Sequence, residues 1–236
     1  MKIAVVGAHG FVGSAIAKAI EFDNRYKLIS VVRDDDIRSK LKLADVVIHA
    51  ANPARRFTAE SDPQRDFIET ADKTSYIFSL AKSKKCLLIS SLSCRTQLNT
   101  SYGRNRRFCE LLALAQGASV IRLGPMFGGA RKQDVLHDLL VGRRVYVSSE
   151  TRYAYVNVEW IGTKVLEFMD AQPDIYEVGA RNSVSLAELR DVFGSSSIFT
   201  GIDDTQIPAM EGGGGPDAML VVEYARNELI SVSDWR

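Results

Sequence analysis

Ser91, Ser93, Tyr102 and Arg106 are the residues whose types and spacing could do chemistry in this sequence. Tyr102 and Arg106 are four residues apart, so they share one face of a helix and can reach the same ligand. A phenol has a reference pKa of about 10, and a cation fixed beside it lowers that value toward the range of a general acid or base. A neighbouring serine can hold a carbonyl or alcohol oxygen. The set therefore indicates proton transfer to or from a hydroxy or keto group.

These residues also have a plain structural interpretation, which the sequence leaves open. Arg106 could pair with Glu110 one turn further along the helix. Tyr102 could be a packing residue, and the serines could be ordinary hydrogen-bonding residues at the end of a strand. The choice depends on whether the fold brings a ligand to this helix.

The first thirteen residues, MKIAVVGAHGFVG, indicate what that ligand is. The apolar run over residues 3–6 is typical of a strand buried on both faces, and apolar residues recur at helical spacing after Gly13. Gly7, Gly10 and Gly13 lie between the two elements, where bare main-chain amides and a helix N-terminus can approach a diphosphate. This order predicts a dinucleotide-binding fold. A glycine-rich turn that binds nothing is the alternative.

The residue after the second predicted strand indicates which dinucleotide is bound. That strand covers residues 27–32, and Arg33 follows it. A carboxylate at this position holds the ribose 2′-hydroxyl of NAD, whereas an arginine suits the 2′-phosphate of NADP. The sequence therefore predicts NADP, with NAD as the alternative because Asp34, Asp35 and Asp36 follow immediately. Arg33 and the aspartates could also form a solvated turn.

The other elements predict a parallel sheet with a shortened edge. A strand over residues 45–50 comes too soon after Arg33 for a complete β-α unit, so we expect only a short helix over 38–43 and a sheet edge that is exposed or covered by another subunit. A long helix over 62–83, a strand over 86–90, a helix from Tyr102 to about Gln116 and a strand over 118–123 are expected to follow. The predicted fold class is α/β, a Rossmann-type doubly wound parallel sheet with helices on both faces.

The rest of the chain is predicted to form a small C-terminal substrate-side lobe. The predicted division is a Rossmann core over residues 1–122 and a lobe over 123–236, with segments that return to the core. Further helices are expected over 134–141, 157–169 and 186–193, and strands over 145–148 and 175–178. The start of the tail, at Ala218, has a strand-like pattern.

Composition argues against several classes of function. The chain has 236 residues, 46% of them hydrophobic, and a formal net charge of +1, which does not favour a nucleic acid or a membrane surface as a partner. It has no apolar run of about 18 residues and enters a strand at once, so we expect a cytoplasmic protein. Neither the three cysteines nor the three histidines have metal-ligand spacing, so no metal site and no disulfide framework is predicted. His49, inside a predicted strand, is expected to be a hydrogen-bonded core residue.

Longer motifs follow one another in a fixed order: GAHGFVG at 7–13, DVVIHAAN at 45–52, LLISSLS at 87–93, YGRNRRFCE at 102–110 and VIRLGPMFGG at 120–129. Together they resemble the extended short-chain dehydrogenase/reductases, a family that includes nucleotide-sugar epimerases, dehydratases and keto-sugar reductases. The resemblance covers most of the chain to about residue 193, and the ordered set is far more specific than any single motif.

The resemblance implies roles for individual residues. Ser91 matches the family's catalytic serine or threonine, and Tyr102 matches its catalytic tyrosine. Arg106 stands where the family has a lysine that lowers the tyrosine pKa and hydrogen-bonds the nicotinamide ribose; arginine keeps the charge on a wider, planar head. Thr70 stands where the family has an asparagine. The implied activity is an NAD(P)-dependent oxidoreductase or epimerase. The alternative is an NADP-binding protein that has lost catalysis and serves as a sensor or partner-binding module.

The resemblance also implies binding residues. The cofactor set comprises the glycine turn, the two strand ends beside it and the catalytic helix: Gly7, His9, Gly10, Phe11, Val12, Gly13, Arg33, Asp36, Ile37, Ala50, Ala51, Tyr102 and Arg106. Ser91, Ser93 and Arg152 are the substrate candidates. Arg152 lies near the segment where family members that use sugar nucleotides place a diphosphate-binding arginine, although an exposed surface charge is the alternative. A homodimer is implied as well.

Overall fold

The computed structural model describes residues 1–129, 134–209 and 214–233, with side chains through residue 227. The chain forms two compact units. The first comprises Met1–Leu123 with Glu159–Tyr176, and the second comprises Gly124–Val158 with Glu177–Arg236. Within the described ranges, no helix combines the length and the apolar character that crossing a bilayer requires.

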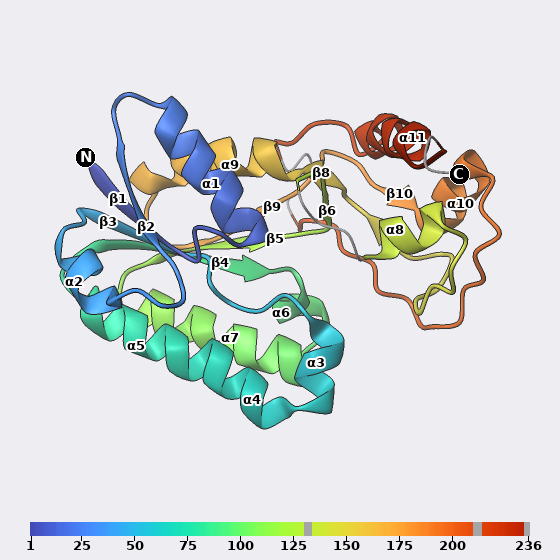
Figure 1. Ribbon diagram of the computed structural model, residues 1–236. Helices are drawn as coiled ribbons and strands as arrows, with labels where there is room; N and C mark the ends of the chain where they lie inside the picture. Colours follow the sequence, from blue (N-terminus) through green and yellow to red (C-terminus); the bar gives the residue numbers. More distant parts are fainter. Residues whose placement is uncertain (130–133, 210–213, 234–236) are drawn as a thin grey trace. The chain divides into compact units, whose positions relative to one another are not determined.

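A six-stranded sheet in the order β2-β1-β3-β4-β5-β9 forms the centre of the first unit (Figure 1). The strand pairs from β2 to β5 are all parallel. Strand order changes direction between β1 and β3, which is the switch point at which doubly wound sheets bind ligands. The strands are β1 (Lys2–Val6), β2 (Lys27–Val31), β3 (Val46–His49), β4 (Lys85–Ser91), β5 (Ser119–Leu123) and β9 (Ile175–Val178).

Helices cover both faces of this sheet. Figure 1 shows α1 (Phe11–Phe22) and α9 (Val158–Glu167) on one face, and α5 (Lys73–Leu80) and α7 (Ser101–Ala115) on the other. The predicted α/β class, a Rossmann-type doubly wound parallel sheet, is therefore confirmed. Beyond β2 the chain forms only α2 (Ile37–Lys42) before it enters β3 on the other side of β1.

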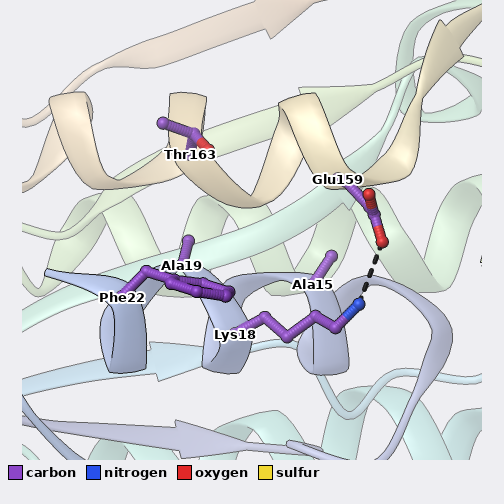
Figure 2. Close-up of a pocket in the computed structure, with 6 residues that line it drawn as sticks. All are labelled: Ala15, Lys18, Ala19, Phe22, Glu159 and Thr163. Atoms are coloured by element: carbon purple, nitrogen blue, oxygen red, sulfur yellow. Dashed lines mark hydrogen bonds and ion pairs between the residues drawn. The ribbon is translucent and has the colours of Figure 1, made fainter.

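The two helices on the first face pack closely through a glycine. A Cβ at Gly162 of α9 would lie 2.3 Å from the Ala15 carbonyl oxygen of α1, so only a glycine permits this approach. Figure 2 shows the small hollow between these helices, with the ion pair of Lys18 Nζ and Glu159 Oε1 at 3.0 Å across it.

The core on the second face comes from alternate residues of the strands, as the two-residue period of a strand requires. Ala4, Val47, Leu88 and Val120 belong to one buried cluster with residues of α5 and α7, among them Phe78 and Ala113. Each large apolar side chain buried in this way contributes roughly 1.5–3 kcal/mol. The packing fixes the helices that carry the candidate site.

The long helix predicted over residues 62–83 is interrupted. In its place the structure has α4 (Pro63–Phe67), a π-helical segment (Ile68–Asp72) and then α5, and a separate short helix, α3 (Arg56–Ser61), comes before them. Asp62 caps α4 by accepting from the Arg65 N–H at 3.1 Å, and Pro63 occupies the first turn, as predicted. The π segment is a departure from the prediction, because hydrophobic periodicity does not reveal one extra residue in a turn.

The second unit consists of short elements. Its strands pair two by two, β10 with β7 antiparallel and β6 with β8 parallel. The elements are β6 (Met126–Phe127), α8 (Val135–Leu140), β7 (Arg152–Tyr153), β8 (Val156–Asn157), β10 (Val184–Ser185), α10 (Leu186–Phe193) and α11 (Leu220–Ser233).

Two predictions for the second unit are wrong. The predicted strand over 145–148 forms only an isolated bridge between Val145 and Phe199. The strand-like tail is the helix α11, in which the buried side chains of Val221, Val222 and Ala225 pack against the unit. A short run of valines predicts a strand locally, and tertiary packing overrides that preference.

Candidate cofactor and catalytic site

The glycine turn between β1 and α1 has the geometry of a phosphate-binding loop. Gly7 has φ +88°, a conformation that favours glycine, and a Cβ there would lie 2.8 Å from the Ala51 Cα. A Cβ at Gly13 would lie 2.0 Å from the Gly7 carbonyl oxygen, so α1 can begin this close to β1 only with a glycine. Gly10 is the N-cap and provides no side-chain cap, which leaves the positive end of α1 to a ligand anion.

Two of the three aspartates after β2, Asp35 and Asp36, are engaged by contacts within the fold. Asp35 Oδ2 accepts from the Val32 N–H at 2.6 Å and pairs with Lys40 Nζ at 2.7 Å, and these bonds hold the pKa of Asp35 below its usual value. Asp36 caps α2 and accepts from the Ser39 hydroxyl at 2.6 Å. Arg33 is exposed at the end of the same strand. Asp34, the next residue, is exposed as well, so this end of the site presents both a cation and a carboxylate to a ligand.

The serines at the end of β4 differ in their roles. Ser90 donates to Glu110 Oε1 at 2.7 Å and is part of the core. Ser91 is half-buried, and its Oγ lies 3.3 Å from the Ser93 Oγ and accepts from the Ser93 N–H at 3.3 Å. Ser93 is fully buried. These contacts favour a role for Ser93 in positioning Ser91 over the predicted role in substrate binding.

The first turn of α7 lies beside these serines. Thr100 caps the helix by accepting from the Gly103 N–H at 3.0 Å. A Cβ at Gly103 would lie 3.0 Å from the Ser93 carbonyl oxygen and 2.1 Å from the Gln97 carbonyl oxygen. Because glycine permits this contact, the turn that carries Tyr102 packs directly on the segment that follows Ser91.

Arg106 lies against Tyr102, as the four-residue spacing predicts. Its guanidinium carbon is 4.8 Å from the centroid of the Tyr102 ring, within the range of a cation–π contact. The alternative pairing of Arg106 with Glu110 is wrong, because Glu110 pairs with Arg107 at 2.9 Å and with Arg122 at 2.7 Å. The positive charge therefore stays beside the phenol.

Two buried donors at this place have no hydrogen-bond partner. Arg106 is only 4% exposed and donates from Nη2 to the Pro53 carbonyl oxygen, yet its Nε–H is unpaired, and so is Nδ2 of Asn52. An unpaired buried donor costs about 1–3 kcal/mol. Ribose hydroxyls and a carboxamide, as in a nicotinamide dinucleotide, offer the missing acceptors. The donors and the glycine turn both fit such a cofactor.

Sequence reasoning did not single out Asn52 as a site residue. It follows β3, which pairs with β1 at the switch point, and its Oδ1 accepts from Thr74 Oγ1 at 3.3 Å. The signal that could have found it is a polar residue three positions beyond the end of a buried strand, at the edge where ligands bind.

His49 is the core residue that the sequence predicts. It is 1% exposed, and Nε2 lies 3.0 Å from Thr74 Oγ1. Burial, together with the charges of Lys73 and Arg106, lowers the pKa of His49 to about 3. The imidazole is therefore neutral across the physiological range. The three cysteines are also buried, and none of them forms a disulfide.

Arg152 lies in the second unit, on β7. Its Nε donates to Ser183 Oγ at 3.0 Å, Nη2 donates to the Ser183 carbonyl oxygen at 2.8 Å, and Nη1 lies 3.5 Å from Glu188 Oε2. The guanidinium is exposed, and its contacts are with residues of the second unit. Its role toward a substrate diphosphate stays a prediction.

No protein-family model matches the chain, and no curated protein matches its sequence. Solved structures do match it in three dimensions. A UDP-glucose 4-epimerase from Thermotoga maritima has a TM-score of 0.78 and 16% identity over 97% of this chain and 100% of that chain. A UDP-N-acetylglucosamine 4-epimerase from Methanobrevibacter ruminantium M1 has a TM-score of 0.78 and 17% identity over 100% of this chain and 99% of that chain.

A third match is a UDP-glucuronic acid 4-epimerase variant from Bacillus cereus, solved with a UDP-sugar and NAD. Its TM-score is 0.78 at 15% identity, over 96% of this chain and 99% of that chain. At these identities the likeness shows the fold. The fold implied by the resemblance to extended short-chain dehydrogenase/reductases is therefore confirmed.

Proposed function

We propose that this protein is an NADP-linked oxidoreductase or epimerase that acts on a sugar nucleotide or a similar hydroxy or keto compound. The observation that carries the proposal is that two buried donors, Nε of Arg106 and Nδ2 of Asn52, have no hydrogen-bond partner, while the Arg106 guanidinium packs on the Tyr102 ring. The glycine turn follows β1, and Asn52 comes after the neighbouring strand β3. A dinucleotide bound at the switch point between these two strands could contact both places.

The residues of the chain would do the proton chemistry. The cofactor, when bound, supplies the hydride transfer at its nicotinamide ring. Tyr102 would take the proton of a substrate hydroxyl on its phenolic oxygen and return it in the reverse direction, while Ser91 would orient the substrate oxygen. Arg106 would keep a positive charge at the phenol and donate from Nε to a ribose hydroxyl.

The choice of substrate and cofactor draws on two further observations. The fold neighbours include proteins solved with UDP-glucose, with UDP-N-acetylmuramic acid and with NAD, which supports a sugar nucleotide as the substrate class. Arg33 is exposed, whereas Asp35 and Asp36 are held by Lys40 and Ser39, which favours the 2′-phosphate of NADP. NAD stays the alternative, because Asp34 is exposed beside Arg33 and could hold a ribose hydroxyl.

Turnover of the Tyr102→Phe variant tests the proposal. With a panel of UDP- and dTDP-linked sugars and keto-sugars, we expect this variant to lose at least about 100-fold in kcat because the proton donor is missing. Its affinity for NADPH should change by less than about twofold. Arg106→Lys is the matched variant and should keep or raise turnover, because an ammonium also supplies the charge.

One observation favours a second function. The Arg106 guanidinium stacks on the Tyr102 ring and is anchored by the Pro53 carbonyl, and Tyr102 is only 6% exposed. A stacked, anchored guanidinium is less free than an ammonium to follow a reacting phenol. A protein that binds the dinucleotide as a sensor would tolerate this arrangement. Equal turnover of wild type and Tyr102→Phe would support it.

The outer face of α4, the π segment and α7 suggests a homodimer. Phe67, Ile68, Phe108 and Leu111 are each roughly half exposed, and the rings of Phe67 and Phe108 are 6.2 Å apart. Apolar side chains gathered on one face of a helix pair are typical of an interface between subunits. We propose that these four residues, the α4–α7 patch, are covered by a second copy of the chain.

A further inference from the structure

We infer that Asn52 donates a hydrogen bond from its side-chain amide to the nicotinamide nucleoside half of the dinucleotide, and that His49 and Thr74 position the amide for this role. The inference deepens the proposed function and rests on its cofactor site. His49 belongs to β3, Asn52 to the loop after it and Thr74 to α5, so the three side chains meet only through the fold.

The loop after β3 packs directly against the glycine turn. The Ala51 Cα would lie 2.8 Å from a Cβ at Gly7. Asn52 is the next residue, and the Pro53 carbonyl oxygen that follows it accepts from Arg106. In a doubly wound sheet the adenosine ribose lies at the end of β2, on one side of β1. A residue after β3, on the other side of β1, therefore faces the nicotinamide half.

A chain of hydrogen bonds runs from the main chain of Ala51 to the side chain of Asn52. The Ala51 N–H donates to His49 Nδ1 at 3.4 Å, which makes Nδ1 the acceptor of the ring. Because the buried ring is neutral, its other nitrogen, Nε2, carries the proton and donates to Thr74 Oγ1 at 3.0 Å. The Thr74 hydroxyl donates in turn to Asn52 Oδ1 at 3.3 Å. Every donor in the chain points toward Asn52.

This chain decides which end of the Asn52 amide is left for a ligand. Thr74 is fully buried, so its hydroxyl proton needs an acceptor inside the protein, and Asn52 Oδ1 supplies it. Nδ2 is then left as a buried donor, without a partner in the described part of the chain. Such a donor is unfavourable until a ligand oxygen reaches it. The site therefore offers an N–H group, and not a carbonyl oxygen, to its ligand.

The nicotinamide nucleoside has acceptors that match this donor. Its carboxamide has a carbonyl oxygen and its ribose has hydroxyl oxygens, and all of them are neutral. The bridging diphosphate is the competing ligand, but the uncapped start of α1 at Gly10 already suits its charge. Nε of Arg106 is a second unpaired donor, and Arg106 contacts the residue after Asn52. Two donors at one loop agree with a ligand group that has several acceptors.

Calorimetric titration of Asn52→Leu, Asn52→Asp and wild type tests the assignment of Asn52. The four probes are NADPH and NADH, together with 2′,5′-ADP and ADP, which lack the nicotinamide nucleoside. We expect Asn52→Leu to weaken NADPH and NADH by at least about fivefold and to leave 2′,5′-ADP and ADP within about twofold. Asn52→Asp keeps an acceptor for Thr74 but lacks the donor, and it should weaken NADPH and NADH at least as much. Asn24→Leu, the same exchange at an exposed asparagine in the turn after α1, is the control and should change nothing.

Thr74→Val and Thr74→Ser test the positioning role. Thr74→Val removes the hydroxyl that holds Oδ1, so the Asn52 amide can rotate, and we expect NADPH to bind about threefold more weakly. Thr74→Ser keeps the hydroxyl and should bind NADPH within about twofold of wild type. In the Asn52→Leu background, Thr74→Val should cause no further loss, because it acts only through the amide. A merely structural role would give the same loss in both backgrounds.

Two results would overturn the assignment of Asn52. Either Asn52 variant could bind NADPH and NADH as tightly as wild type does, or Asn52→Leu could weaken ADP as much as the whole dinucleotides, which would assign the amide to the diphosphate. An additive loss from Thr74→Val would overturn the positioning role. A circular-dichroism melt of each variant separates loss of binding from loss of folding. If wild type binds none of the four probes, the proposed function itself fails, which is a different outcome from an Asn52→Leu variant that binds normally.

Discussion

His49 is a residue whose protonation the fold controls strongly. It lies on β3, in contact with Thr74 and edge-on to Phe78, and burial lowers its pKa from 6.5 to about 3. Because Lys73 and Arg106 also disfavour the charged form, the imidazole stays neutral in the folded protein. The unfolded chain binds a proton at this residue below about pH 6.5.

This difference predicts how stability depends on pH. Between pH 6.5 and pH 3 the unfolded state carries the proton and the folded state does not, so the free energy of unfolding falls as the pH falls, by up to about 1.4 kcal/mol per pH unit. Urea unfolding at pH 7.5 and pH 5 should show a smaller loss for His49→Gln than for wild type, by about 2 kcal/mol. His9→Gln, at an exposed histidine, is the control. Identical losses in His49→Gln and wild type would contradict the account.

Individual site residues can be predicted from the sequence when neighbouring residues in the chain define their role. They are missed when their role depends on contacts that only the fold creates. Gly7, Gly10 and Gly13 could be predicted because a strand, a turn and a helix need them in that order. Asn52 could not be assigned in the same way. It becomes notable only because the fold buries its Nδ2 without a hydrogen-bond partner.

Among the elements, β4, β5 and α7 are joined by a buried charge cluster. Glu110 of α7 is fully buried and accepts from Arg122 of β5 at 2.8 and 2.7 Å and from Ser90 of β4 at 2.7 Å. Burial raises the pKa of Glu110, but the hydrogen bonds from Arg122, Ser90 and Arg107 outweigh it and place the pKa below its ordinary value. The cluster fixes the helix that carries Tyr102 on the strand that carries Ser91.

Removal of the carboxylate should therefore be costly. Glu110→Ala leaves the buried Arg122 guanidinium without its partner, and we expect a loss of about 3–5 kcal/mol in the free energy of unfolding. Arg107→Ala is the matched control because its side chain is 35% exposed, and it should cost less than about 1 kcal/mol. Chemical denaturation at pH 7.5 measures both. Similar small losses for the two variants would show that the cluster does not hold the elements together.

Elements were predicted well where their ends carry capping residues. Ser185 and Glu188 form a capping box at the start of α10, and Asp62 with Pro63 starts α4, so both starts are visible in the sequence. The cluster of Glu110, Ser90 and Arg122 was not predicted, because its members are brought together only by the pairing of β4 with β5. The helix α11 was missed for a similar reason, since packing in the second unit decides its structure.

The proposed dimer is a property of the whole molecule. Light scattering after size exclusion should give wild type the mass of two chains. Phe108→Glu, in the middle of the α4–α7 patch, should give the mass of one, because a carboxylate at a buried apolar interface is unfavourable by several kcal/mol. Phe22→Glu, on the helix α1 that covers the opposite face of the sheet, should stay dimeric. A monomeric wild type would rule out this interface.

The central claim for the whole molecule is that the glycine turn binds a nicotinamide dinucleotide, and a titration of the purified protein with NADPH and NADH tests it most directly. The account predicts saturable binding, tighter for NADPH, a rise in melting temperature, and a loss of both in Gly10→Ala, whose methyl group would enter the turn 3.2 Å from the Gly7 carbonyl oxygen. The absence of heat and of any melting shift with either coenzyme, in a folded wild-type protein, would contradict it.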